Sequence, residues 1–245
     1  RRDPTVTGIA TSAIASGGLV APPRVANTET WNGSSWTEVS DLNTARGLMG
    51  GVGADNTEQL VYGGNSPSIV ANTEFFDGST WTEVSDLGTA RQSPGNAGTT
   101  TSALAAGGSP GNKSDVEEWT TTPSALFQKQ VEGQLFFNST ANAFKETITD
   151  IPGATWASSG NLNEGRGNAG SSGTQTATLF FGGEPPGGSQ SALTEQYDGS
   201  SWTEVADLNV ARGQQFFSNQ GTQTAALSAT GVPLQTSVES WNGSS

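Results

Sequence analysis

The residue types that most often do chemistry in proteins are scarce in this chain of 245 residues. It contains no His and no Cys, which excludes imidazole bases, thiolate nucleophiles and the usual ligands of zinc and haem. Two Tyr and 23 Asp and Glu residues remain as groups that could attack a substrate or transfer protons. We therefore predict no catalytic residue, no metal site and no cofactor, and leave a pair of loop carboxylates as the open alternative.

Five of the carboxylates recur at one place in the sequence. A Glu stands two residues before an aromatic residue five times, and an Arg recurs with a similar period. Residues two apart lie on one face of a strand, so we expect each Glu to pair with an Arg in a structural role, through bidentate hydrogen bonds at the interfaces between repeats. The residues are Glu29, Glu74, Glu117, Glu195 and Glu239, with Arg1, Arg46, Arg91, Arg166 and Arg212.

The net charge of −13 limits the partners that the surface suits. Five such pairs would use half of the ten basic residues and leave 18 acids against 5 bases elsewhere. An acidic surface repels phosphate, so we expect no nucleic acid partner. No apolar run reaches the length that a membrane span needs, so we expect no membrane insertion.

A Trp recurs ten residues before a repeat Arg, and two interpretations fit it. Exposed indole faces would suit stacking against sugars. One Trp per repeat at a fixed position suits packing between repeats, and this packing role is the one that we expect. A glycosidase is disfavoured because Asp77 is adjacent to Gly78, which does not match the SxDxGxxW box of sialidases. The recurring residues are Trp36, Trp81, Trp156 and Trp202.

The whole chain is built from repeats of about 45 residues. Residues 31–46, 76–91 and 197–212 are near copies, and residues 155–166 form a divergent copy. The repeat Arg recurs at intervals of 45, 75 and 46, which places an insertion of about 30 residues in the third unit. Each unit contains four short strand-like segments, and Asp-Gly or Asn-Gly, dipeptides typical of tight hairpins, join the last two.

Four antiparallel strands repeated at this period predict one blade of a β-propeller. We therefore predict an all-β fold in which residues 1–245 form a single propeller domain of about five four-stranded blades. The predicted blades are residues 1–45, 46–90, 91–165 with the insertion at 120–150, 166–211, and an incomplete blade at 212–245.

The repeat positions at which the sequence begins and ends bear on how the blades would close into a ring. Residue 1 is a repeat Arg, and residue 245 stands one position before the place of a repeat Trp. We expect either an arc of a larger ring in a longer polypeptide, or five blades whose last outer strand is missing or supplied by another chain.

The repeat resembles the kelch repeat. Gly63-Gly64 is followed by Phe76-Asp77-Gly78, then by Trp81 and, ten residues later, Arg91. The resemblance implies a propeller with one blade per repeat, in which Gly-Gly ends a strand and the Trp lies on the outer strand, packed between blades. The fifth unit departs from the pattern, with Thr230-Gly231 where Gly-Gly is usual.

The insertion has no counterpart in the other repeats. Residues 132–148 read EGQLFFNSTANAFKETI, in which apolar residues alternate on both sides of a polar turn. We expect an extra hairpin whose Phe136, Phe137 and Phe144 mark a contact site. The hairpin resembles those of tailed-phage fibre and virion proteins. The near-identical, Cys-free repeats, rich in Ser and Thr, resemble propeller arrays in structural proteins of marine tailed phages.

These resemblances imply a non-enzymatic propeller located on the virion, in a tail fibre or capsid appendage. Its partners would be other virion proteins or a host surface receptor or glycan, and a homo-oligomer stays open. The alternative is a kelch protein-protein interaction module of a cellular or secreted protein, extracellular in the second case. In both we expect recognition by the loops after the Gly-Gly pairs, where the units differ most in sequence.

Overall fold

A computed structural model of the chain describes residues 1–20, 23–121, 154–214, 221–229, 231–233 and 237–244, and the backbone of residues 135–138 and 143–146. The described residues form strands, turns and loops, with no helix among them. Consequently none of these residues belongs to a helix of the length and apolarity that spanning a membrane requires.

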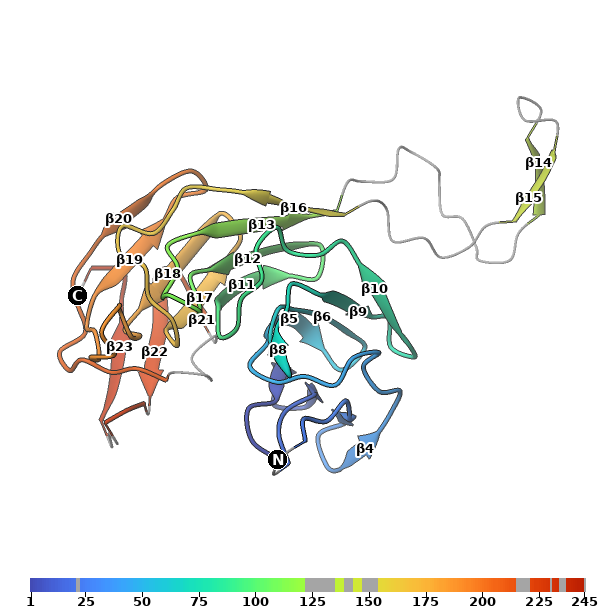
Figure 1. The fold of residues 1–245 in the computed structure, drawn as a ribbon, viewed down its shortest axis with the longest axis horizontal. Coiled ribbons are helices and arrows are strands. Elements are labelled where there is room, and N and C mark those ends of the chain that lie inside the picture. Colours follow the sequence, from blue (N-terminus) through green and yellow to red (C-terminus); the bar gives the residue numbers. More distant parts are fainter. Residues whose placement is uncertain are drawn as a thin grey trace.

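Most strands form five antiparallel sheets that follow one another along the chain (Figure 1). The short strands β7 (Asn65–Ser66) and β8 (Ser68–Ile69) pair with each other in the loop after Gly63-Gly64. Four sheets have four strands, and the fifth has three within the described residues. The first is β1 (Thr5–Ile9), β2 (Ser12–Ser16), β3 (Thr28–Trp31) and β4 (Trp36–Glu38); the second is β5 (Gly50–Asp55), β6 (Glu58–Tyr62), β9 (Thr73–Phe76) and β10 (Trp81–Val84); the third is β11 (Gly95–Thr99), β12 (Ser102–Ala106), β13 (Val116–Thr120) and β16 (Thr155–Ser158); the fourth is β17 (Gly170–Thr174), β18 (Ala177–Phe181), β19 (Thr194–Tyr197) and β20 (Trp202–Glu204); the fifth is β21 (Gly221–Thr222), β22 (Ala225–Ala229) and β23 (Val238–Trp241).

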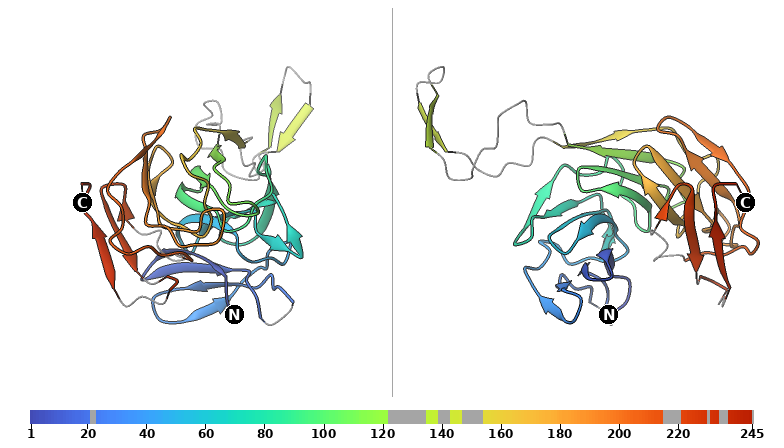
Figure 2. Two further views of the ribbon diagram at one scale, coloured as in Figure 1. Left: turned by 60° about the vertical axis from the view of Figure 1, so that its left-hand side comes forward. Right: turned by 180° about the vertical axis from the view of Figure 1, so that it is seen from behind.

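The sheets are arranged as the blades of a five-blade β-propeller. Strand β5 contacts β1 and β11, and β17 contacts β11 and β21, so the first strands of the blades lie side by side in chain order. The other strands of each blade follow outward, and the repeat Trp begins the outermost strand (Figure 2). The predicted all-β propeller is confirmed, with about five blades of four strands.

Apolar side chains fill the spaces between neighbouring blades. In the first interface, Ile14 and Leu42 of the first blade pack against Val61, Phe76 and Trp81 of the second. The same pattern, with aliphatic residues of one blade against aromatic residues of the next, recurs along the chain. The later clusters include Leu60 and Leu87 with Trp119 and Trp156; Leu104 and Leu162 with Tyr197 and Trp202; and Leu179 and Leu208 with Trp241.

The Gly-Gly pairs end the second strands because another backbone segment lies against them. Gly63 has a φ of +64°, and a Cβ there would lie 2.4 Å from the carbonyl oxygen of Arg91. The Gly64 N–H donates to that same carbonyl over 2.8 Å. A side chain at Gly63 would therefore displace the connection that leads into the next blade.

The hairpin turns between the third and fourth strands are closed by an acid or amide side chain. Asp77 Oδ1 accepts hydrogen bonds from the backbone N–H groups of Ser79 and Thr80, both over 2.8 Å. Asp198 and Asn32 make the same contacts in their own blades. These local bonds, with the positive φ of the following Gly, favour the turn in each repeat.

The insertion contains the predicted hairpin. Strand β14 (Leu135–Asn138) pairs antiparallel with β15 (Ala143–Glu146), with Phe137 opposite Phe144 and Phe136 opposite Lys145. The side chains of these residues lie outside what the structure describes, so the predicted contact site stays a prediction.

Candidate functional site

Five Arg–Glu ion pairs recur at the predicted positions, one for each blade. In the second blade Arg46 Nη2 lies 2.9 Å from Glu74 Oε1, and the two side chains are 0% and 2% exposed. The pair of Arg1 and Glu29 is more open, at 12% and 42%. The other pairs are buried and join Arg91 to Glu117, Arg166 to Glu195 and Arg212 to Glu239.

The prediction that these pairs are bidentate is wrong. Arg91 Nη2 donates to Glu117 Oε1 over 2.6 Å, whereas Nη1 donates to the carbonyl oxygens of Gly107 and Asp115 over 3.0 and 2.8 Å. The carbonyls just after the second strand and just before the third therefore occupy one side of the guanidinium, and a single amino group faces the carboxylate.

The second oxygen of each buried carboxylate holds the preceding blade. Glu74 Oε2 accepts hydrogen bonds from the backbone N–H and the side-chain amide of Asn43, over 2.7 and 2.9 Å. Asn163 binds Glu195 in the same way. Burial lowers the pKa of Arg46, and the nearby Glu74 carboxylate counteracts that shift. The pairs thus join consecutive blades, which is a structural task.

Carboxylates meet across the third and fourth strands, whereas the open alternative for acid-base chemistry was a pair in the loops. Glu74 lies opposite Glu83, and Glu195 lies opposite Glu204. In the first of these pairs, Glu74 is held by Arg46, and Glu83 Oε1 accepts from the Asn72 side chain over 2.9 Å. Both carboxylates of that pair therefore serve the framework.

A tyrosine cluster between the third and fourth blades was not predicted from the sequence. The Tyr197 hydroxyl donates to Glu118 Oε1 over 2.6 Å and also contacts the Ser159 hydroxyl. Burial and the hydrogen bond to Glu118 raise the pKa of Tyr197 to about 12, so the phenol stays protonated at neutral pH. No local sequence signal points to this cluster, because Glu118 and Ser159 belong to the third blade and Tyr197 to the fourth.

Three of the four recurring Trp residues, Trp81, Trp156 and Trp202, lie between blades. Trp81 and Trp202 are each 6% exposed, and Trp156 packs partly buried against the adjoining core. Trp36 contradicts the packing prediction, because its side chain is 47% exposed. The reason is its place in the first blade, where the described residues supply no preceding blade to cover it.

The loops that follow the Gly-Gly pairs join second to third strands and so lie at one end of the propeller. Each loop is anchored at its base by a backbone bridge to the segment after the repeat Arg. Neighbouring loops are also linked, since Arg24 Nε donates to Asn65 Oδ1 over 2.9 Å and Asn65 Nδ2 donates to Gln92 Oε1 over 3.1 Å. The bridges join Leu19 to Arg2, Asn65 to Gly47, Ser109 to Gln92, Glu184 to Gly167 and Val232 to Gly213.

The insertion leaves from the opposite end. It lies between β13 and β16, in the place of the hairpin turn that joins the third and fourth strands of other blades. The two predicted contact regions, the anchored loops and the inserted hairpin, are therefore attached at opposite ends of the propeller.

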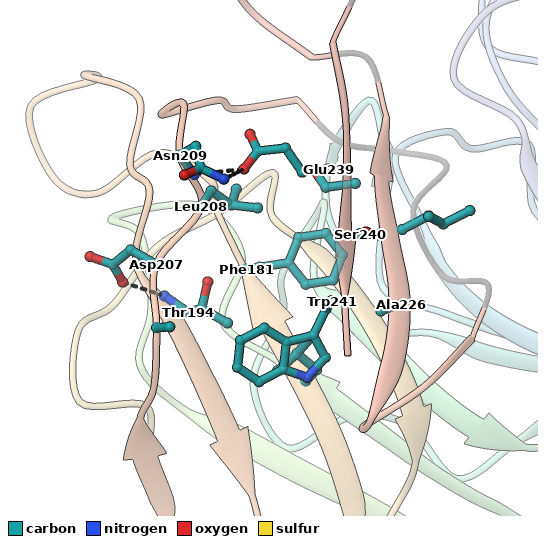
Figure 3. Close-up of a pocket in the computed structure, with 13 residues that line it drawn as sticks. Phe181, Thr194, Asp207, Leu208, Asn209, Ala226, Glu239, Ser240 and Trp241 are labelled. Atoms are coloured by element: carbon teal, nitrogen blue, oxygen red, sulfur yellow. Dashed lines mark hydrogen bonds between the residues drawn. The ribbon is translucent and has the colours of Figure 1, made fainter. Parts of the chain in front are cut away.

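The hollows among the described residues include one where the first strands of four blades meet. It measures about 330 Å³, including space open to solvent, and is lined by residues that include Thr7, Gly53 and Asn96. Another, of about 380 Å³ and partly open to solvent, lies between the fourth and fifth blades (Figure 3). Phe181 and Trp241 face its interior, with Thr194 and Asp207 on one wall.

Within the described ranges, no three His, Cys, Asp or Glu side chains come close enough together to hold a metal ion.

Comparison with known proteins relates the chain to solved propellers. No family model and no curated protein matches the sequence. The chain is similar to the solved structure of YjhT, with a TM-score of 0.71 over 98% of this chain and 80% of that one. The sequences are 12% identical, so the likeness concerns the propeller fold.

Proposed function

We propose that this chain is a non-enzymatic recognition propeller carried on a virion, in a tail fibre or capsid appendage, where it binds a host surface or a neighbouring virion protein. The kelch-like repeat and the phage-like insertion support this proposal from the sequence. The observation that carries it is the set of loops, anchored by the same backbone bridge in all five blades at one end of the propeller.

Anchored loops suit recognition for a physical reason. A loop that is already ordered loses little conformational freedom when it binds, so more of its contact energy appears as affinity. The repeat residues hold the blades together, whereas the loop residues differ between units and are free to vary. At this end of the propeller, the loop residue Val20 is 53% exposed and is therefore accessible to a partner.

The charge distribution also sets this end apart. Of the described basic residues, Arg2, Arg24 and Lys113 lie outside the five ion pairs. All three belong to the anchored loops or to the segments bridged to them. Asp3, Asp115 and Glu184 lie in the same loops and segments. In a chain of net charge −13, an acidic glycan or protein surface would therefore meet charges of both signs at this end.

Two measurements on purified particles and host cells test the proposal. Antibodies raised against the chain should label the particle surface by immunogold microscopy, and the purified chain should compete with particles for adsorption to host cells. A variant with Arg24→Ser and Lys113→Ser should compete less. Substitutions in the turns at the opposite end, Ser34→Lys and Ser79→Lys, form the control and should leave competition unchanged.

One result would replace the proposal with its alternative. If the antibodies find the chain only in cellular or secreted fractions, and the purified chain does not affect adsorption, the propeller is an interaction module of a cellular or secreted protein.

A further inference from the structure

The filled interfaces show where the repeat Trp belongs. Trp81 of the second blade donates from Nε1 to the Ser40 carbonyl over 3.0 Å and to the Thr28 hydroxyl over 3.2 Å, both in the first blade. In the next interface Trp156 donates to the Thr73 hydroxyl over 3.3 Å. Each such Trp therefore sits in a socket made by the preceding blade.

The aromatic residue of the adjacent strand forms the other wall of each socket. The ring centroids of Phe76 and Trp81 are 5.2 Å apart, and those of Tyr197 and Trp202 are 4.9 Å apart. These tilted ring pairs join the third strand to the fourth, since Trp81 is the register partner of Phe76.

The pocket between the fourth and fifth blades is the same socket without its Trp. Thr194 takes the place of Thr28, Ala206 that of Ser40, and Trp241 that of the aromatic wall; all three line the pocket (Figure 3). Strand β23 is the outermost strand of its sheet within the described residues, so no fourth strand there presents an indole.

The exposure of equivalent repeat positions shows that the described part of the fifth sheet lacks the cover of an outer strand as well as an indole. Thr28, Thr73, Val116 and Thr194 are at most 2% exposed, whereas Val238 at the same position is 61% exposed. In complete blades this position is covered by the outer strand, whose backbone continues the ladder: the Val205 N–H donates to the Thr194 carbonyl over 2.9 Å.

The segment after the outer strand also contributes contacts. Asp86 Oδ1 accepts a hydrogen bond from the Thr73 N–H over 3.0 Å, and Asp207 does the same for Thr194. The Leu that follows, Leu87 in the second blade, is 4% exposed in the interface core. In complete blades, the Trp, the Asp and the Leu of the pattern Trp-Thr-Glu-Val-x-Asp-Leu thus each make a defined contact.

We propose that the outer edge of β23 and the adjoining pocket bind an extended peptide segment of this pattern, by strand addition with the indole as anchor. The segment pairs its backbone with β23, places its Trp against Trp241, and directs the indole N–H to Thr194 and the carbonyl of Ala206. Three filled sockets in the same molecule, those of Trp81, Trp156 and Trp202, supply the geometry. The proposal does not depend on the proposed function.

A peptide with the sequence of residues 36–46, WTEVSDLNTAR, tests the site directly. Labelled with fluorescein and titrated with the intact chain, it should show saturable anisotropy with a Kd of about 10–100 μM. Replacing its Trp with Ala should raise the Kd at least about tenfold, because the socket is left empty. N-methylation of the backbone N–H groups that face β23 should have a similar effect.

Two variants of the chain locate the binding. Ala226→Phe fills the pocket from a residue that lines it and should abolish peptide binding. Ala13→Phe changes the equivalent residue of the first blade, where Trp36 is exposed rather than seated in a socket, and should leave binding unchanged. Thr194→Val keeps the shape of the side chain and removes its hydroxyl, and it should weaken peptide binding roughly threefold to tenfold. This variant tests the pocket if Ala226→Phe does not fold.

Several results would overturn the proposal. No saturable binding up to about 1 mM peptide would do so, as would equal affinity for the Trp and Ala peptides, or binding that the pocket variants leave unchanged. Sedimentation velocity distinguishes another occupant: self-association of the chain that is lost in Ala226→Phe would assign the site to a second copy instead of a free segment.

Discussion

The buried Arg46, Arg91 and Arg212 are each tied to a carboxylate and to a backbone carbonyl, so neither charge of these pairs stands alone. Taking such charges out of water is costly, and their mutual attraction offsets that cost only with good additional hydrogen bonds. The Asn43 and Gly88 N–H donors to Glu74 and Glu117 supply those bonds from the preceding blade. The pair therefore ties the stability of one blade to the next.

Removing one partner should consequently be severe. We expect Arg91→Ala to lower the free energy of unfolding by about 3–5 kcal/mol, because it leaves the Glu117 carboxylate buried without its cation. Urea denaturation followed by Trp fluorescence measures the change. The control is Arg1→Ala, whose partner Glu29 is 42% exposed, and which should cost less than about 1 kcal/mol. Equal losses of unfolding free energy in the two variants would show that burial does not determine how much an ion pair contributes to stability.

Low pH should also destabilise the fold through the hairpin turns. Hydrogen bonds from the backbone N–H of Ser201 and from Ser200 lower the pKa of Asp198 to about 2, from an ordinary 3.8. A lowered folded-state pKa gives stability that is present above pH about 4 and is lost as the pH falls toward 2.

The variant Asp198→Asn isolates this effect, because Asn32 makes the same turn in the first blade. We expect its melting temperature to match that of the parent at pH 7 and to fall less between pH 4 and pH 2. Thermal unfolding followed by circular dichroism at each pH makes the comparison. A parallel decline in both proteins would show that the turn carboxylate is not the titrating group.

At the scale of the element, one sequence position has different environments in different blades. The central Leu or Ile of the second strand is 0% exposed at Ile14, Leu60 and Leu104, but 57% exposed at Leu227. The strand pattern is the same in each case. What differs is whether an outer strand and a following blade cover it.

This difference predicts unequal effects of the same substitution. Leu104→Ala should lower the free energy of unfolding by about 2–5 kcal/mol, since it opens a cavity in a packed interface. Leu227→Ala should cost less than about 1 kcal/mol, because the side chain is already 57% exposed. Chemical denaturation of the two variants, measured side by side, tests the comparison; a large loss at Leu227 would mean that this face is covered in solution.

At the scale of the whole molecule, the blades form a chain of nearest-neighbour contacts. The third blade packs against a neighbour on each side, through the clusters that contain Trp119 and Leu104. The first and last blades each expose one face, where Trp36 and Val238 are 47% and 61% exposed. Stability should therefore decline from the middle blade toward both ends, as in other repeat architectures.

Native-state hydrogen exchange should reveal this gradient. We expect amides of β12 and β13 to exchange at least about tenfold more slowly than those of β22 and β23. Adding saturating WTEVSDLNTAR peptide should slow exchange in β23 and leave β12 unchanged. Uniform protection across all five sheets would show that the propeller opens as one unit.

The sequence predicted the main features that depend on spacing within one repeat. The strand order, the Asp77-Gly78 turn and the pairing of Arg46 with Glu74 follow from residue types at fixed intervals, because one repeat folds into one blade. The inserted strands were predicted as well, from the alternation on both sides of a polar turn.

Contacts between blades were decided only by the tertiary structure. The contact of Tyr197 in the fourth blade with Glu118 in the third depends on where the two blades meet. The sequence by itself determined that Trp36 and Trp81 hold the same place in their blades. Only the packed molecule decided that Trp81 is buried and Trp36 exposed, because burial belongs to the space between two blades and no single repeat contains that space.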